Sequence, residues 1–236
     1  MKLLKASEIK KILIGVSLTD GTIDLKNQRF GFYSKQEEYA RYIYNTLSQI
    51  TGMGVKFQVV NDKSGYKGFR VWTRKHAYWK NLGDKVYNGR KQLTPYIVNR
   101  IDEECLAHMW MCDGYLATTK NRKSNKAQNV GWWCLEAFPL EELELFQKKL
   151  QKMGIESSLV SVRWGYGWRV RVGGENLQLM ISKMYPYILD CFLYKTPLFY
   201  KTLESVNMEL PNAEQYIHLY GSIEDIVRHP LKKGRT

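Results

Sequence analysis

Two apolar stretches of the chain each end in an aspartate followed by a glycine. They read LIGVSLTDG over residues 13–21 and LAHMWMCDG over residues 106–114. A single ending of this kind is typical of a helix stopped by glycine, with a solvated aspartate beside it. An acid is mildly unfavourable at this point, because the C-terminal end of a helix dipole is negative. Two such endings in one chain therefore favour a role in chemistry.

Packing the two apolar helices against each other would bring their aspartates together. Gly15 and Ala107 are small enough to allow close backbone approach, which would place Asp20 beside Asp113. Two neighbouring carboxylates repel each other, and a divalent cation removes this repulsion. Oxygen ligands with a partly open shell suit Mg²⁺, or another divalent cation such as Mn²⁺. Metal positions between two acids suit hydrolysis of a phosphodiester bond.

The segments that follow the two Asp-Gly stretches are similar to each other and occur in the same order. TGMGVKFQVV (51–60) resembles QKMGIESSLV (151–160), and SGYKGFRVWTR (64–74) resembles WGYGWRVRVGG (164–174). Apolar periodicity predicts the same succession of elements in both copies, αββαββα. The predicted helices of the two copies cover residues 7–20, 35–50, 76–87, 102–113, 139–153 and 175–190. Strands are predicted at 22–33, 55–74, 115–120, 130–138 and 155–173.

These patterns predict an α+β fold built from two pseudo-symmetric αββαββα repeats. Each repeat would form a twisted antiparallel β-saddle, with the two helices that end in Asp-Gly (the signature helices, ending at 20 and 113) packed at the interface between repeats. We expect an N-terminal repeat over 1–90, a linker over 91–101, a C-terminal repeat over 102–195 and an extension over 196–236.

The composition favours a polyanionic partner. Lys and Arg number 36 against 23 Asp and Glu, a formal net charge of +13, which is typical of nucleic-acid-binding proteins. The four cysteines show no disulfide-like spacing, which favours a reducing compartment. No apolar run has transmembrane length. We therefore expect a protein without membrane contact, in the cytoplasm or in the matrix of an organelle that encodes it.

The two Asp-Gly stretches, each followed by the same succession of elements, resemble the LAGLIDADG homing endonucleases of the monomeric two-motif branch. The resemblance implies that Asp20 and Asp113 bind the metals, with the backbone carbonyls of Thr19 and Cys112 nearby. It departs from the signature at two places, because His108 replaces a glycine and Cys112 replaces a small residue.

The resemblance also implies basic residues around the scissile phosphates. Lys91 and Lys195 follow the last helix of each copy and both precede a proline, so we predict this catalytic role for them. Glu136 and Lys35, near the start of each middle helix, are weaker candidates for positioning water.

The hairpins of both repeats alternate apolar residues with basic or amide residues. Arg169 and Arg171 oppose Val170 and Val172 in this way, and few acids interrupt the polar face. Arginine and glutamine on such strands can read guanine and adenine in the major groove, and loop lysines can contact phosphates. The predicted DNA-binding residues are Arg29, Lys56, Gln58, Lys67, Arg70, Trp72, Arg74, Lys120, Arg122, Lys123, Arg163, Arg169 and Arg171.

The sequence therefore predicts an intron-type, monomeric endonuclease that cuts both strands of a long asymmetric double-stranded site across the minor groove. Two other functions fit the same fold: an RNA-binding maturase that acts on its intron RNA, and a DNA-binding regulator that does not cut. A zinc site formed by Cys105, His108 and Cys112 is disfavoured, because a fourth ligand is missing and the helix is needed for packing.

Overall fold

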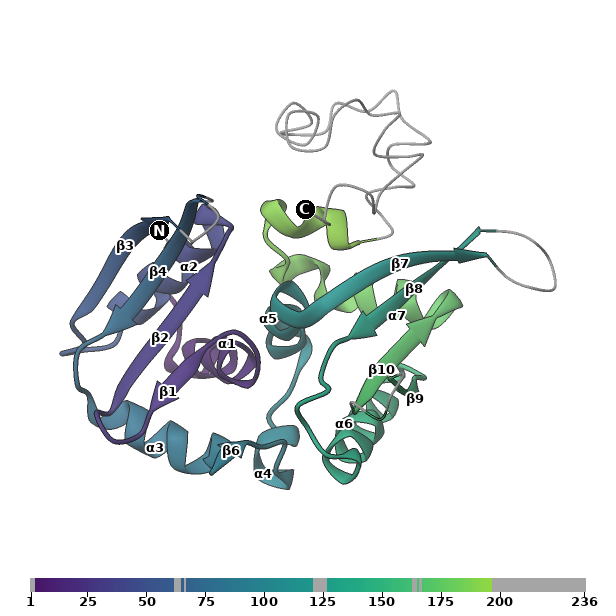
Figure 1. Cartoon of the computed structure of the whole chain (residues 1–236), viewed down its shortest axis with the longest axis horizontal. Helices are drawn as coiled ribbons and strands as arrows, with labels where there is room; N and C mark the ends of the chain where they lie inside the picture. Colours follow the sequence, from purple (N-terminus) through teal and green to yellow (C-terminus); the bar gives the residue numbers. More distant parts are fainter. Residues whose placement is uncertain are drawn as a thin grey trace.

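Two four-stranded sheets flank a central pair of helices in the computed structural model (Figure 1). The central helices are α1 (Ala6–Leu18) and α5 (Glu103–Asp113), the two signature helices. Each sheet follows one of them along the chain, so each signature helix belongs to one half of the molecule. The structure describes residues 3–61, 65, 67–120, 127–162, 165 and 167–196.

The first half consists of α1 and a sheet with the strand order β1-β2-β4-β3, in which all neighbours are antiparallel. Phe30, Phe32 and Val71 are buried on one face of this sheet, where the apolar residues of its strands meet the helices. The elements after α1 are β1 (Thr22–Asp24), β2 (Arg29–Ser34), α2 (Glu37–Ser48), β3 (Val55–Asn61), β4 (Lys67–Thr73) and α3 (Ala77–Val86).

The second half repeats this arrangement with the strand order β7-β8-β10-β9, again antiparallel throughout. The predicted α+β fold of two αββαββα repeats is confirmed. The elements after α5 are β7 (Gly114–Lys120), β8 (Ala127–Trp133), α6 (Leu140–Lys152), β9 (Ser158–Ser161), β10 (Trp168–Gly173) and α7 (Gly174–Met184).

Some local predictions were wrong. The helix predicted over 175–190 ends at Met184, and a 3₁₀ turn η2 (Tyr185–Tyr187) follows. Pro186 lies in that turn, and proline cannot supply the N–H that would continue the α-helix. A second 3₁₀ helix, η3 (Asp190–Lys195), was not predicted. The connection between repeats also holds unpredicted elements, namely β5 (Tyr87–Asn88), β6 (Arg90–Lys91) and α4 (Pro95–Val98).

The two signature helices approach each other closely at Gly15. A Cβ atom added to Gly15 would lie 2.6 Å from the carbonyl oxygen of Cys105 and 3.0 Å from the Cβ of His108. Ala107 is also fully buried. At the opposite end of the pair, Lys11 of α1 forms a 2.5 Å ion pair with Asp102, which caps α5. None of the helices in the described part of the chain is long and apolar enough to cross a bilayer.

Candidate active site and DNA-binding surface

The ends of the two signature helices bring Asp20 and Asp113 into the same small region. Asp113 is the last residue of α5, and Asp20 follows the residue that caps α1. Burial and the charge of Asp20 together raise the pKa of Asp113 to about 7. Burial also raises the pKa of Asp20, although the Asp20 side chain keeps contact with solvent. The charge of Asp20 therefore acts on Asp113 at the paired helix ends.

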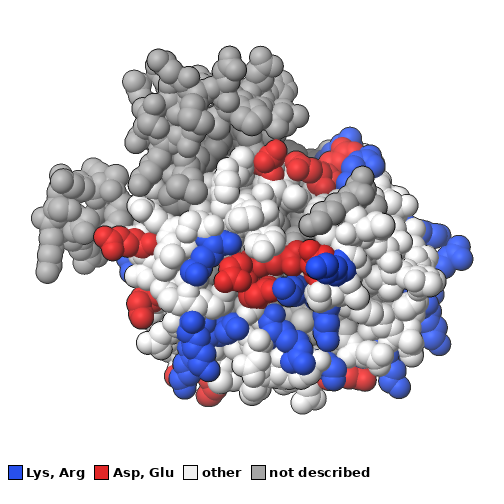
Figure 2. Space-filling view, turned by 180° about the vertical axis from the view of Figure 1, so that it is seen from behind, with Lys and Arg blue, Asp and Glu red and all other residues white. Residues whose placement is uncertain are grey.

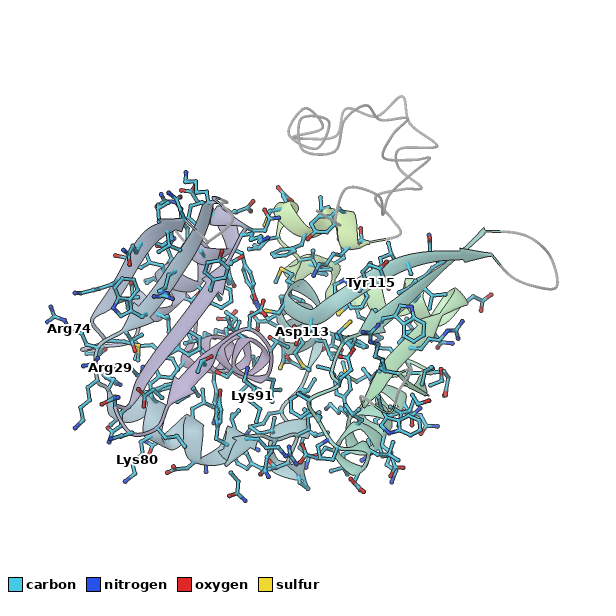
Figure 3. The ribbon with its side chains drawn as sticks, in the orientation of Figure 1. Arg29, Arg74, Lys80, Lys91, Asp113 and Tyr115 are labelled. Atoms are coloured by element: carbon cyan, nitrogen blue, oxygen red, sulfur yellow. The ribbon has the colours of Figure 1, made fainter. Side chains whose placement is uncertain are left out.

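Lys91 and Lys195 cap the same helix ends from outside the helices. The Lys91 ammonium, from β6, donates to the carbonyl oxygen of Thr19 at the end of α1. The Lys195 ammonium, from η3, donates to the carbonyls of Met111 at 2.8 Å and Cys112 at 3.3 Å, at the end of α5. Burial lowers the pKa of both lysines, and the nearby carboxylates oppose this shift. One half-buried ammonium thus lies at the end of each signature helix, beside the paired acids. Figure 3 shows Lys91 and Asp113 close to the ends of α1 and α5.

The donor set fits a divalent cation. Two carboxylates with raised pKa values gain most from a cation that neutralises them. The described residues contain no group of three or more His, Cys, Asp and Glu side chains that could hold a metal alone. A cation would therefore depend on Asp20 and Asp113, with further oxygens from water or phosphate. The carbonyls of Thr19 and Cys112, predicted to be close to the metal, accept hydrogen bonds from the two lysines.

The first sheet presents one polar face built from three strands. Strand register aligns Lys56 with Trp72, and Gln58 with Arg70, so these four side chains share a face. Lys56, Gln58 and Arg70 are exposed on it. A depression of about 500 Å³ on this sheet is lined by Arg29, Lys56, Trp72, Thr73, Arg74 and Lys75. Figure 3 shows Arg29 and Arg74 together at the edge of the sheet.

Lys67 does not join this surface. Side chains alternate along β4, so Lys67 lies on the same face as Phe69, opposite Arg70. Its ammonium lies 5.3 Å from the centre of the Phe69 ring and 4.0 Å from the Glu37 carboxylate of α2. Lys67 therefore lies apart from the face that carries Arg70, and its contact with DNA stays a prediction.

The second sheet presents its own polar face, with more aromatic side chains. Arg171 pairs with Trp132 of β8, and its guanidinium lies 6.0 Å from the centre of the Trp132 ring. Tyr115 pairs with Trp132 from the other side and is 43% exposed. Arg169 forms an ion pair with Glu136, so its guanidinium already has a carboxylate partner.

A family model describing the LAGLIDADG DNA endonuclease family matches residues 10–180. The chain belongs to the LAGLIDADG DNA endonuclease family. No curated protein sequence matches it. The solved structure of the homing endonuclease I-WcaI bound to its DNA recognition sequence is 22% identical, with a TM-score of 0.67, and the match covers 83% of this chain and 87% of that one.

Two further LAGLIDADG-like structures share the fold at lower identity. The meganuclease I-SmaMI, bound to uncleavable DNA, is 12% identical with a TM-score of 0.55, over 96% of this chain and 97% of that one. Full-length DUF199/WhiA from Thermatoga maritima is 10% identical with a TM-score of 0.52, over 93% of this chain and 67% of that one. At these identities the likeness concerns the fold.

Several predicted DNA contacts of this LAGLIDADG chain lie outside the described residues, namely Arg122, Lys123 and Arg163. Lys120 ends β7. The sequence prediction missed Tyr115 and Trp132. Tyr115 could have been found, because it follows the second Asp-Gly directly and alternates with the buried Leu116.

Proposed function

We propose that this protein is a single-chain, sequence-specific endonuclease of the intron homing type, which cuts both strands of double-stranded DNA across the minor groove. The observation that carries the proposal is the pairing of Asp20 with Asp113 at the ends of the signature helices, with one lysine at each end. The carboxylates would hold Mg²⁺ or Mn²⁺. When bound, the cation would activate water and neutralise the phosphate.

The chain's own residues supply the rest of the reaction environment. Asp20 and Asp113 would fix the attacking water and the scissile phosphates between the two helix ends. The ammonium groups of Lys91 and Lys195 lie at the same ends and would stabilise the charge that develops on the phosphate oxygens. Because both lysines are partly buried, their charges act with less solvent screening than surface lysines would.

Two different sheets on one chain support recognition of a long asymmetric site. We infer that the repeats over 1–90 and 102–195, joined by 91–101, each read one half-site. Of the extension over 196–236, the structure describes only Thr196. Figure 2 shows acidic side chains gathered across the middle of the face opposite the view of Figure 1. Because that band would repel DNA, we propose that the target DNA binds the face on which the signature helices end.

The same geometry supports a monomer. Two signature helices in one chain already form the interface that a single-copy relative must build by dimerising. The packing of Gly15 against the α5 backbone, at 2.6 Å from the position of an added Cβ, leaves no room there for another chain.

The test is cleavage of a plasmid that carries the uninterrupted insertion locus of the gene. Incubation with Mg²⁺ is expected to give linear DNA, and incubation with EDTA is expected to give none. Asp20→Asn/Asp113→Asn serves as the inactive control. Tight binding of the locus without cutting would instead indicate a regulator. Binding of the intron RNA with improved splicing, and no cutting, would indicate a maturase.

A further inference from the structure

A chain of polar side chains leads from the buried interface of the two halves to Asp20. The Nδ1 atom of His108 lies 3.0 Å from the hydroxyl of Tyr39, and that hydroxyl lies 3.6 Å from Sγ of Cys112. The Cys112 thiol in turn lies beside Asp20, where a hydrogen bond to the carboxylate opposes the rise that burial causes in the pKa of Asp20. His108 and Cys112 belong to α5, whereas Tyr39 belongs to α2 and Asp20 follows α1. The chain therefore links the two repeats.

The inner part of this chain is held rigidly. Tyr39 and His108 are each 1% exposed, and their rings stack with centroids 5.8 Å apart. Tyr42 stacks on His108 at 5.5 Å, and Phe192 packs edge-on against Tyr39 at 5.2 Å. Burial lowers the pKa of His108 to about 3, so the imidazole is neutral at physiological pH. Aromatic packing on several sides thus fixes the Tyr39 hydroxyl beside Cys112.

The matching places in the first signature helix do not form such a chain toward Asp113, and the Thr19 side chain instead contacts the Cys112 thiol. Gly15 and Thr19 stand in LIGVSLTDG where His108 and Cys112 stand in LAHMWMCDG. The Thr19 hydroxyl donates back to its own helix, to the carbonyl of Gly15 at 2.9 Å. His108 and Cys112 are also the positions at which the second stretch departs from the LAGLIDADG signature. The departure therefore has a structural consequence.

We propose that Cys112, held in place by Tyr39 and His108, is a positioning residue for the Asp20 carboxylate, and that Asp113 has no equivalent. The inference rests on the proposed endonuclease function. A donor from Cys112 restricts the orientations that the Asp20 carboxylate can adopt. The two carboxylates are consequently unequal, and the two DNA strands are cut with unequal dependence on Cys112.

The test follows each strand separately on a plasmid with one target site. Removing one hydrogen bond to a charged group is expected to slow one strand about tenfold in Cys112→Ala, while the other strand changes less than about twofold. Nicked circles should then accumulate. Cys112→Ser should restore the rate, because a hydroxyl can also donate. Tyr39→Phe should slow the same strand by a smaller factor, since it keeps the ring packing.

Two measurements separate positioning from general damage. Mn²⁺ binding, followed by the loss of the free Mn²⁺ signal in electron paramagnetic resonance, should weaken in Cys112→Ala and recover in Cys112→Ser. Cys191→Ala is the matched control, because Cys191 is a half-buried thiol that hydrogen-bonds Glu38 and not either of the paired acids. Equal slowing of both strands, or unchanged strand ratios in Cys112→Ala and Tyr39→Phe, would overturn the inference. Failure of the proposed function is distinct, because the wild-type protein itself would then not cut.

Discussion

The same position in the two sheets carries an arginine in two different states. Trp72 pairs with Gly31 in the first sheet as Arg171 pairs with Trp132 in the second. Arg70 and Arg169 lie two residues before these positions, so they are equivalent in the two sheets. Arg70 is exposed, and within the described residues it makes no salt bridge.

Arg169 is instead paired with Glu136. Glu136 stands where the first repeat has Lys35, so a reversal of charge at one position accounts for the difference. The two sheets share a fold, but they present arginines that differ in whether a carboxylate already binds the guanidinium.

The difference between the sheets reaches the paired acids. The charge of Glu136 is one cause of the raised pKa of Asp113, whereas the main influences on Asp20 besides burial are Lys195 and the Cys112 thiol, which lower its pKa. Charges at the start of the second repeat's middle helix thus act on one acid more than on the other. The pseudo-symmetry of the fold does not extend to the electrostatics of its site.

The largest expected effect is the loss of either acid. Asp20→Asn and Asp113→Asn should each lower double-strand cleavage by about a thousandfold or more, because a bound cation supplies several kcal/mol of stabilisation to the transition state. DNA binding should be retained or become tighter, since a negative charge near the phosphates is removed. Cleavage assays and gel-shift titrations on the same preparations measure both effects. Near wild-type cutting of both strands by either variant would contradict the proposal that Asp20 and Asp113 hold the cation.

Replacing Arg70 or Arg169 by alanine should have a smaller effect, on base preference. The effect should differ between the two halves of the protein. Arg70→Ala should relax base preference at a few positions of one half-site, by about 1–3 kcal/mol if the contact is a good bidentate one. Arg169→Ala should act less strongly, because its guanidinium is shared with Glu136. Glu136→Gln removes the carboxylate partner of Arg169. In that variant, Arg169→Ala should therefore change base preference more than it does in the wild-type protein.

The measurement is a cleavage profile over a library of single-base variants of the site. Lys67→Ala is the matched control, because Lys67 lies on the other face of β4. A uniform loss over all variants would mean that the arginine contacts phosphate, and would appear as a lower salt dependence.

The sequence predicted those features that follow from periodicity and repetition. The two αββαββα repeats, the Gly15 crossing and the pairing of Asp20 with Asp113 were all readable from the two Asp-Gly stretches and the segments that follow them. The ion pair between Glu136 and Arg169 was not, because it depends on the distance between a loop and a strand 33 positions apart. The network through Tyr39 joins three segments, and only the packed interface brings them together.

The smallest expected difference between the halves appears in the pH dependence of metal binding and tests the electrostatic difference between the acids. The pKa of Asp113 is raised from 3.8 to about 7 in the folded protein, so ionisation is disfavoured there relative to the unfolded chain. The metal-free protein should therefore lose stability as pH rises from about 4 to about 7, and Asp113→Asn should unfold at a higher Tm than wild type at pH 8.

Because a cation must displace the proton on Asp113, Mn²⁺ binding should weaken by about tenfold for each pH unit below 7. The groups that face Asp113 are Asp20, Lys91, Lys195 and Glu136. Glu136→Gln removes the one acid among them that lies in the turn after β8. It should therefore strengthen Mn²⁺ binding at pH 6 about two- to threefold, and should change binding little at pH 8, where Asp113 is already ionised. Lys35→Gln is the matched change in the other half and should leave the pH dependence as it is. Titrations of Mn²⁺ at both pH values measure these ratios. An equal response to the two substitutions would show that the halves do not differ electrostatically at the acids.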